Sequence, residues 1–212
     1  MKVEIWSDVM CPFCYIGKRR FEEALAKFPN ADEVEITWKS FQLNPEMVTD
    51  PSISIHQYLA DAKGWQLDYA KQMAAQVTEM AAGVGLTFNM DNAVVANSFN
   101  AHRFSHLATA NGLGDAAEEA LFKAYFTDGK NTDDIKVLTQ LGVSISLKAE
   151  EIEGVLASDK YADEVKQDIL EAGQIGVRGV PFFVFDRKYA VSGAQPMELF
   201  LQTLEKAKGE EF

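Results

Sequence analysis

Cysteine and basic residues are both scarce in this sequence. Two cysteines in 212 residues cannot form a disulfide framework, and a chain of this length buries enough surface to fold without cross-links. The 20 Lys and Arg residues are outnumbered by 32 Asp and Glu residues, which gives a net charge of −12 at pH 7. Because this charge repels phosphate backbones and anionic lipid, we expect neither nucleic acid nor a membrane as a partner.

Long apolar runs are also missing. No segment approaches the roughly 20 apolar residues of a membrane span, and the first residues lack the apolar run of a secretory signal peptide. These absences predict a cytoplasmic protein. Hydrophobic residues make up 47% of the sequence and no internal repeat is present, which indicates one folded domain that carries a large insertion.

Strand patterns are confined to the two ends of the chain. Residues 3–6 form a short β-prone run, residues 11–28 place apolar side chains at helical spacing, and residues 34–41 alternate apolar and polar types. Near the other end, residues 182–185 and 189–191 predict a hairpin, and Pro196 begins an amphipathic helix. The ends therefore predict a β-α-β unit and a β-β-α unit.

Helical patterns occupy the segment between these units. Candidate helices lie near residues 54–63, 66–82, 92–110, 115–127, 133–141, 148–157 and 159–172, separated by glycines and polar turns. We therefore predict an α/β domain built from residues 1–45 and 174–212. Residues 46–173 form a helical insertion domain in this interpretation.

The two cysteines are three residues apart, in the motif Cys11-Pro12-Phe13-Cys14. The motif follows the first predicted strand and opens the first predicted helix, which is the position in which Cys-x-x-Cys indicates redox chemistry. The positive end of the helix dipole favours a thiolate at Cys11, so we expect Cys11 to be the exposed nucleophile. Cys14, one turn further along, is expected to be the protected resolving thiol.

Two other interpretations of the cysteines stay open. In the first interpretation both thiols are buried and structural, since free cysteine is among the most buried residue types. Alternatively, they are half of a zinc site with His102 and His106, which lie four residues apart on one predicted helix face. The long interval between Cys14 and His102 does not match zinc-finger spacing, and we therefore predict no metal site.

Several charged residues lie close to the motif in sequence. The basic run 18–20 is expected to be a solvated face of the first helix. Glu4 and Asp8 are candidate carboxylates for moving the proton of Cys14, although a solvated or capping role is the simpler interpretation of either. We interpret His102 as a packing or hydrogen-bonding residue and leave it out of the catalytic set.

Four motifs follow one another along nearly the whole chain. They are Ser7-Asp8 ahead of Cys11-Pro12-Phe13-Cys14-Tyr15-Ile16-Gly17, Phe41-Gln42-Leu43-Asn44-Pro45, Asn97-Ser98 with Ala101-His102-Arg103, and Gly176-Val177-Arg178-Gly179-Val180-Pro181. In this order and spacing the sequence resembles DsbA-like thioredoxin-fold oxidoreductases, and among them the cytoplasmic FrnE-type subgroup. The resemblance implies a thioredoxin fold with a large all-helical insertion, which agrees with the division predicted above.

The resemblance also implies that the Val180-Pro181 bond is cis and faces the cysteine pair. From spacing alone, a trans proline at the start of a strand stays the alternative. Because proline has no N–H, an extended substrate is able to pair with the backbone of Val180. We therefore assign catalysis to Cys11, Cys14 and Pro181 and substrate binding to Pro12, Phe13 and Val180, with no metal and no cofactor.

The function that explains all of these motifs is thiol–disulfide exchange or isomerisation on a protein or small-molecule substrate, with glutathione as a candidate small thiol. The related 2-hydroxychromene-2-carboxylate isomerases and kappa-class glutathione transferases typically lack one or both thiols. A glutathione-dependent transferase or isomerase that uses Cys11 alone is therefore the first alternative. A redox-independent, peptide-binding chaperone module is the second.

Overall fold

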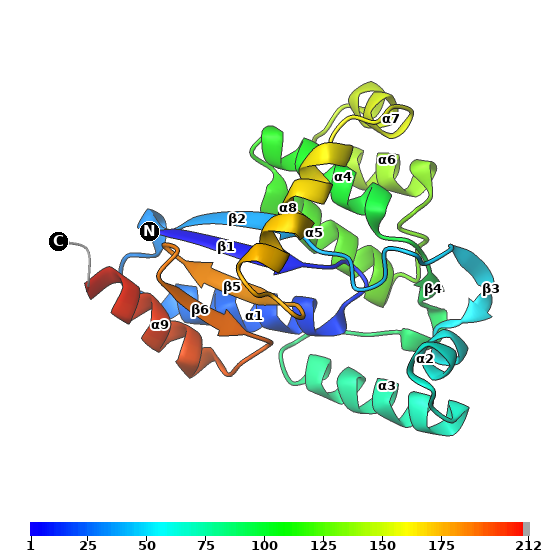
Figure 1. Ribbon diagram of the computed structural model, residues 1–212, viewed down its shortest axis with the longest axis horizontal. Coiled ribbons are helices and arrows are strands. Elements are labelled where there is room, and N and C mark those ends of the chain that lie inside the picture. The colour runs from blue at the N-terminus through cyan, green and yellow to red at the C-terminus, as the bar shows by residue number, and fades with distance from the viewer. Residues whose placement is uncertain (210–212) are drawn as a thin grey trace.

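The computed structural model describes residues 1–209, and a four-stranded sheet in the order β2-β1-β5-β6 lies at its centre (Figure 1). Strand β1 (Lys2–Ser7) runs parallel to β2 (Glu35–Ser40) and antiparallel to β5 (Phe182–Phe185). Strand β5 pairs antiparallel with β6 (Tyr189–Ser192). The two ends of the chain therefore form one sheet, as their patterns predicted.

Alternation along β1 explains how both faces of the sheet are covered. Val3 and Ile5 pack with α1 (Pro12–Lys27) and α9 (Met197–Gly209) in one hydrophobic cluster. Trp6 points to the other face, packs with residues of α8 (Ala162–Gln174), and donates its indole N–H to the Asp168 carbonyl over 3.0 Å. Because successive strand residues face opposite sides, one short strand anchors helices on both.

The remaining helices gather at one end of the sheet (Figure 1). They confirm the predicted thioredoxin fold with a helical insertion. Their bounds are α2 (Ile55–Lys63), α3 (Leu67–Ala82), α4 (Phe99–Ala110), α5 (Gly114–Phe122) with the π-helical turn η3 (Lys123–Thr127), α6 (Ile135–Ser144) and α7 (Ala149–Leu156).

Two features of the insertion differ from the predicted helices. It also contains a small antiparallel sheet of β3 (Asp50–Ser54) and β4 (Val94–Val95). Helix α4 begins at Phe99 rather than near residue 92, because the 3₁₀ turn η2 (Met90–Asn92) and β4 precede it. A further 3₁₀ turn, η1 (Ala31–Glu33), leads into β2.

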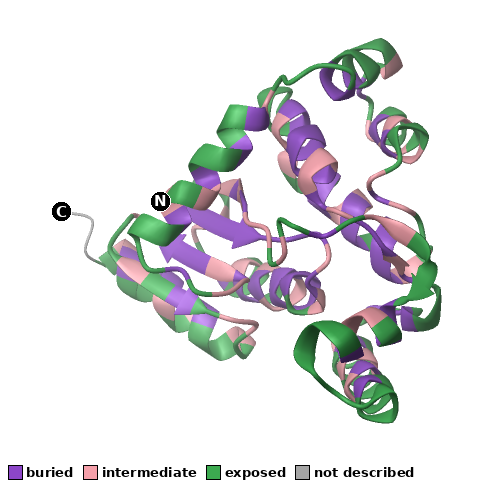
Figure 2. Cartoon of the chain, turned by 45° about the vertical axis from the view of Figure 1, so that its right-hand side comes forward, coloured by how far each residue is buried: buried purple, intermediate pink, exposed green. Residues whose placement is uncertain are grey.

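Helix α1 contributes to two hydrophobic cores. Phe21 packs on the sheet with Phe183 and Phe200, with ring centroids 5.5 and 5.8 Å away. Tyr15 and the two cysteines belong to the core of the helical insertion. Figure 2 shows the buried residues along the sheet and along the inward faces of the helices. Since α8 of the insertion also packs on the sheet, the division at residues 45 and 173 stays a prediction.

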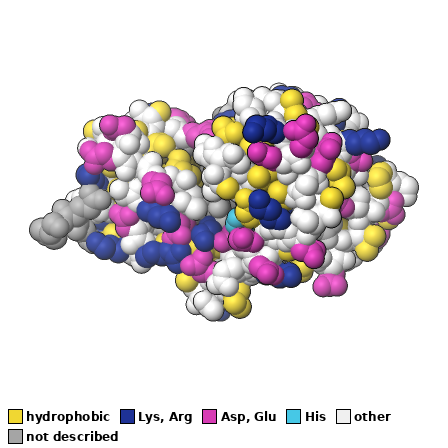
Figure 3. Space-filling model, turned by 90° about the horizontal axis from the view of Figure 1, so that it is seen from above, with side chains coloured by type: hydrophobic (Ala, Val, Ile, Leu, Met, Phe, Trp, Pro, Cys, Tyr) yellow, Lys and Arg dark blue, Asp and Glu magenta, His cyan; other side chains and the backbone are white. Residues whose placement is uncertain are grey.

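Acidic and basic side chains are interspersed on the face shown in Figure 3. Within residues 1–209, no helix has both the length and the hydrophobicity that crossing a membrane requires.

Candidate active site

The first turn of α1 carries the cysteine motif. Cys11 is the N-cap residue, with φ −90° and ψ 111°, and a proline follows at the start of the helix. Proline fits this position because the N–H groups at a helix start have no partner within the helix. The Cys11 amide donates to the carbonyl of Asp8 over 3.0 Å, so a tight turn places Cys11 at the positive end of α1.

Both thiols are free and buried. Cys11 is 4% exposed and Cys14 is 1% exposed, so the expectation that Cys11 is an exposed thiol is wrong for this structure. The two cysteines lie in the core cluster formed largely by the helical insertion, and Val180 packs against the same cluster. Segments that are distant in sequence therefore bury the two cysteines. The local pattern around the motif does not reveal this burial.

Val180 and Pro181 lie beside the cysteine motif, and the bond between them is cis, as the resemblance implied. The Cys11 thiol donates a hydrogen bond to the carbonyl oxygen of Val180, with 3.5 Å between Sγ and O. Pro181 is buried and directly precedes β5. Because Pro181 lies just before the first residue of β5, its missing N–H removes no hydrogen bond from the interior of the sheet.

The two residues between the cysteines differ in exposure. Pro12 is half-buried, whereas the ring of Phe13 is 39% exposed. The six predicted site residues therefore lie on two adjoining segments, the first turn of α1 and the loop before β5. Their individual roles stay predictions.

The environment of Cys14 opposes ionisation. Burial raises the pKa of the Cys14 thiol well above its ordinary value, and the neighbouring Cys11 sulfur raises it further. The nearby Ser7 side chain and Asp8 backbone lower this pKa without reversing the shift. A protonated, protected Cys14 is the state expected of a resolving thiol.

Glu4 and Asp8 are not solvated, contrary to their simpler interpretation. Glu4 is 4% exposed and forms an ion pair with Arg187 at the β5–β6 turn. Asp8 is fully buried, and its Oδ2 accepts a hydrogen bond from the Leu43 amide over 2.7 Å. Partners far away in sequence allow these carboxylates to be buried.

The predicted solvated face of α1 is also wrong for Lys18. Its side chain is 2% exposed and forms ion pairs with Glu22, with Asp115 over 3.1 Å and with Glu119 over 3.4 Å. Burial lowers the pKa of Lys18, but these carboxylates outweigh that effect and raise it. The pairs with Asp115 and Glu119 join α1 to α5, so Lys18 has a structural role.

The two histidines of α4 have different partners. His102 is buried, with its Nε2 3.4 Å from Asp8 Oδ1. His106 Nε2 lies 3.2 Å from Ser40 Oγ and 3.1 Å from Asp168 Oδ2. The described part of the chain holds no group of three or more His, Cys, Asp or Glu side chains arranged for a metal ion.

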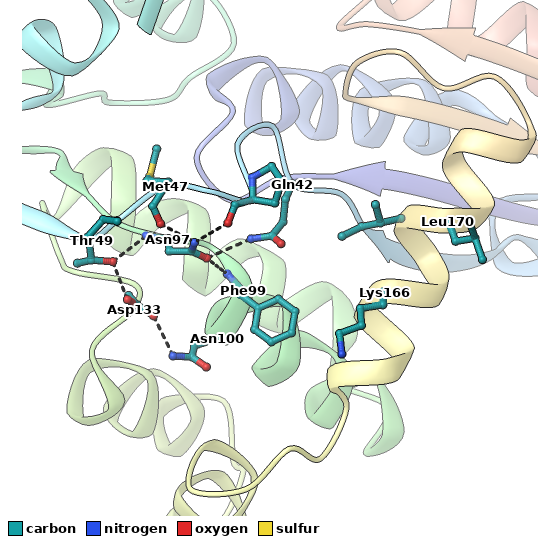
Figure 4. A pocket seen from close by; sticks show the side chains of 12 residues that line it. Gln42, Met47, Thr49, Asn97, Phe99, Asn100, Asp133, Lys166 and Leu170 are labelled. Carbon is teal, nitrogen blue, oxygen red and sulfur yellow. Dashed lines mark hydrogen bonds between the residues drawn. The ribbon is translucent and has the colours of Figure 1, made fainter. Parts of the chain in front are cut away.

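A cleft of about 980 Å³ lies between α8 and the start of α4, as Figure 4 shows. Gln42 lies on the wall of this cleft. The residues on either side of Gln42 form hydrogen bonds with Ser7 and Asp8, which precede the cysteine motif. The Phe41 amide donates to the Ser7 carbonyl over 3.0 Å, and the Leu43 amide reaches Asp8. The cleft is lined by Gln42, Pro45, Met47, Val48, Thr49, Asn97, Phe99, Asn100, Asp133, Lys166, Ile169 and Leu170.

Asn97 holds the cleft wall in place, a role that sequence reasoning missed. Its Oδ1 accepts from Gln42 over 3.1 Å, and its Nδ2 donates to the carbonyls of Pro45 and Met47 over 3.2 and 2.7 Å. Figure 4 shows these bonds converging on the Asn97 side chain. The resemblance included both Asn97 and Gln42, but nothing in the local pattern joined them.

Comparisons with known proteins agree with this geometry. A family model described as the DSBA-like thioredoxin domain matches residues 2–205. The chain is similar to a probable DsbA oxidoreductase from Streptomyces coelicolor, with 41% identity, a TM-score of 0.93, and coverage of 100% of this chain and 92% of that one.

Two more distant structures share the fold. The cytosolic disulfide reductase DsbM from Pseudomonas aeruginosa is 16% identical, with a TM-score of 0.70 and coverage of 99% of both chains. A 2-hydroxychromene-2-carboxylate isomerase is 16% identical, with a TM-score of 0.69 and coverage of 99% of this chain and 95% of that one. The expected resemblance is confirmed, since the family model spans most of the chain. The protein belongs to the DsbA-like thioredoxin family of thiol–disulfide oxidoreductases.

Proposed function

We propose that the protein catalyses thiol–disulfide exchange, with Cys11 as the nucleophile and Cys14 as the resolving thiol. The observation that carries this proposal is the asymmetry of the pair. Cys11 caps the start of α1, where the helix dipole favours an anion, and Cys14 lies deeper with a raised pKa. Such an arrangement separates one attacking thiol from one that acts only after a mixed disulfide forms.

The exchange balances without a cofactor. The Cys11 thiolate attacks one sulfur of a substrate disulfide, the substrate S–S bond breaks, and the other half leaves as a thiolate. Cys14 then attacks Cys11, forms the Cys11–Cys14 disulfide and releases the bound half. The reverse sequence reduces the Cys11–Cys14 disulfide and oxidises two substrate thiols to a disulfide.

Substrate contacts follow from the groups around the Cys11 sulfur. Val180 offers its backbone carbonyl 3.5 Å from the Cys11 sulfur, and Pro181 follows it across the cis bond. The exposed ring of Phe13, next to Pro12, adds an apolar surface for a substrate. A cysteine that is 4% exposed favours a small thiol or a flexible segment as its substrate over a rigid protein surface. The cleft along Gln42 would accommodate the remainder of such a substrate.

Glutathione is the small thiol that the comparisons support. The cytosolic disulfide reductase DsbM, which shares this fold, was solved with GSH. The cytosolic setting of that protein also supports a cytoplasmic location here. A glutathione-dependent transferase or isomerase that needs only Cys11 is the second candidate, because an isomerase shares the fold.

Cysteine replacements test the proposal. Cys14→Ser should abolish turnover with a small disulfide and accumulate a mixed disulfide on Cys11, visible on non-reducing gels of cell extract and by mass mapping. Cys11→Ser, the matched control, should lose both turnover and adduct. Turnover that survives Cys14→Ser but not Cys11→Ser would establish the transferase or isomerase alternative. Function that survives Cys11→Ser would establish the chaperone alternative.

A further inference from the structure

The two walls of the cleft that Gln42 lines both continue toward Cys11. On one wall, Gln42 follows Phe41, which packs against the same hydrophobic cluster as Val180. The other wall is α8, and the chain that leaves this helix leads to Val180, whose carbonyl accepts the hydrogen bond of the Cys11 thiol. We therefore expect a substrate that reacts at Cys11 to extend into the cleft.

The hydrogen bonds of Asn97 decide which atom Gln42 presents to the cleft. Asn97 donates through Nδ2 to the carbonyls of Pro45 and Met47, so its Oδ1 is the atom that faces Gln42. Since an amide oxygen accepts and an amide nitrogen donates, Gln42 must offer its Nε2 to Asn97. Its Oε1 then points away from Asn97, as Figure 4 shows, and no residue within 1–209 donates to this oxygen. One wall of the cleft therefore carries an oriented, free acceptor.

Lys166 on α8 is the one basic residue among the described residues that line the cleft. Its ion-pair partner is Asp163 on the same helix, at 3.5 Å, and the two side chains are 67% and 96% exposed. A pair so open to solvent contributes little, so Lys166 is available to an anion. The acidic residue of the lining, Asp133, already accepts hydrogen bonds from Asn100 and Thr49 over 2.8 and 2.6 Å.

The charge and the apolar surface of the cleft define the ligand that it fits. The net charge of −12 repels anions at long range, so an anion binds only where a local cation offsets this repulsion. Beside Lys166 the lining is apolar, with Phe99, Ile169 and Leu170. A cleft of about 980 Å³ has the size of a small-molecule site. These features match a ligand with a carboxylate, an N–H donor and an apolar group, which the carboxyl end of a short peptide combines.

We propose that the cleft binds the carboxyl end of a short peptide disulfide whose cysteine sulfur reacts with Cys11. The peptide carboxylate pairs with Lys166, the N–H of its last residue donates to Gln42 Oε1, and its apolar last side chain packs against Phe99. This inference rests on the proposed exchange function and names the substrate class of that site. In the reaction the Cys11 thiolate bonds to the peptide sulfur, the peptide disulfide breaks, and its other half leaves as a thiolate.

Matched peptide disulfides test this selection. Each peptide starts with N-acetylcysteine and ends with leucine, with no, one or two glycines between them, and is made with a free carboxylate and with a carboxamide. Because an extended residue spans about 3.3–3.6 Å, the series scans the distance from Cys11 to Lys166. The second-order rate constant with the reduced, full-length protein is divided by that of the same disulfide with 2-mercaptoethanol, which removes differences in intrinsic reactivity. At one of the lengths the wild type should prefer the carboxylate roughly fivefold, the upper range for an ion pair open to solvent.

Replacement of Lys166 should remove this preference. Lys166→Gln should bring the ratio of carboxylate to carboxamide rates to about one, and Lys166→Glu should invert the ratio. Lys148→Gln is the matched control, because Lys148 is 76% exposed and pairs with Glu151 three residues away at 3.7 Å, but does not line the cleft. This control should keep the wild-type ratio. A wild-type ratio at or below one at every length, or equal ratios in Lys166→Gln and the wild type, would overturn the inference.

An ester analogue tests the contact with Gln42. In this analogue an ester oxygen replaces the N–H of the last residue and leaves the carboxylate and the side chain in place. The wild type should react with the ester roughly fivefold more slowly than with the amide, because the donor to Oε1 is lost. Gln42→Met lacks the acceptor and should react equally with both. An amide preference of the same size in both proteins would refute the contact.

A binding measurement separates failure of this inference from failure of the exchange function. The same peptides are made with serine in place of cysteine, so that no exchange occurs, and are titrated by NMR into the wild type and Lys166→Gln. The carboxylate peptide should bind the wild type roughly fivefold more tightly than the variant. Equal dissociation constants would overturn the inference. Turnover that survives Cys11→Ser would instead contradict the exchange function and would leave this difference in binding unchanged.

Discussion

The backbone of Gly17 passes so close to Pro181 that a Cβ atom at Gly17 would lie 2.9 Å from Pro181 Cγ. Such a separation is too short for two carbon atoms, and the proline ring has little freedom to move away. Glycine at this position of α1 therefore lets the helix approach the segment that covers Cys11. The ordinary helix preference for alanine is outweighed by packing here.

Gly17→Ala should destabilise the protein and disturb the site. Alanine gains about 1 kcal/mol of helix propensity, whereas overpacking costs about 1–3 kcal/mol, so the net loss should be roughly 1 kcal/mol. Displacement of Pro181 should also change the rate at which Cys11 reacts with a small aromatic disulfide. Denaturant unfolding and stopped-flow absorbance measure the two effects.

Gly154→Ala in α7 is the control for this substitution. A Cβ at Gly154 has no atom within 4 Å, so the propensity gain should appear alone, as an increase of up to about 1 kcal/mol. The packing argument fails if both alanine variants stabilise the protein equally.

Alkylation should distinguish the two thiols. Because burial raises the pKa of Cys14, its thiolate fraction at neutral pH is small, and Cys11 should react first with iodoacetamide. Cys14→Ser should leave the rate of modification almost unchanged, whereas Cys11→Ser should slow it by roughly tenfold or more. Peptide mass mapping over time makes the comparison. Finding Cys14 modified first would contradict the assignment of roles.

The parts of the fold that are local in sequence were predictable. The β-prone run of β1, the Cys-Pro pair at the start of α1 and the strand signal of β5 each depend on neighbours within a few residues. The cis bond before Pro181 and its place beside the cysteine motif followed once the resemblance supplied the fold. Short-range pattern and family likeness together therefore placed the cysteine motif correctly.

The burial of charged residues was not predictable in this way. Asp8 faces His102, and Lys18 contacts Asp115, only because the helical insertion folds back over α1. A charged residue met in sequence is solvated in most proteins, and its partner is invisible until the tertiary fold brings it near. The burial of Cys11 was not predictable for the same reason, since the residues that pack around it are distant in sequence.

Asp168 of α8 is another buried carboxylate, and it joins the helix to the sheet. It is 3% exposed and accepts hydrogen bonds from Lys39 Nζ over 2.8 Å and the Ser40 amide over 2.9 Å, with His106 Nε2 at 3.1 Å. Burial raises the pKa of Asp168, but these partners outweigh it, and the pKa lies below its ordinary value. Asp168 therefore stabilises the folded protein in its ionised form.

Acid unfolding should reveal this contribution. A carboxylate with a lowered pKa in the folded state stabilises the protein above the unfolded pKa of about 3.9, and the stabilisation is lost as the pH falls through the folded value. Asp168→Asn should reduce the free energy of unfolding at neutral pH by about 3 kcal/mol, since it leaves Lys39 without its closest carboxylate, and should flatten the acid limb of the stability curve. Denaturant titrations at a series of pH values measure both effects.

Asp163→Asn is the control on the same helix, because the Asp163 side chain is 96% exposed and pairs with Lys166 at 3.5 Å. This substitution should change the free energy of unfolding by less than about 0.5 kcal/mol. Equal effects of the two substitutions would show that Asp168 does not anchor α8 through its charge.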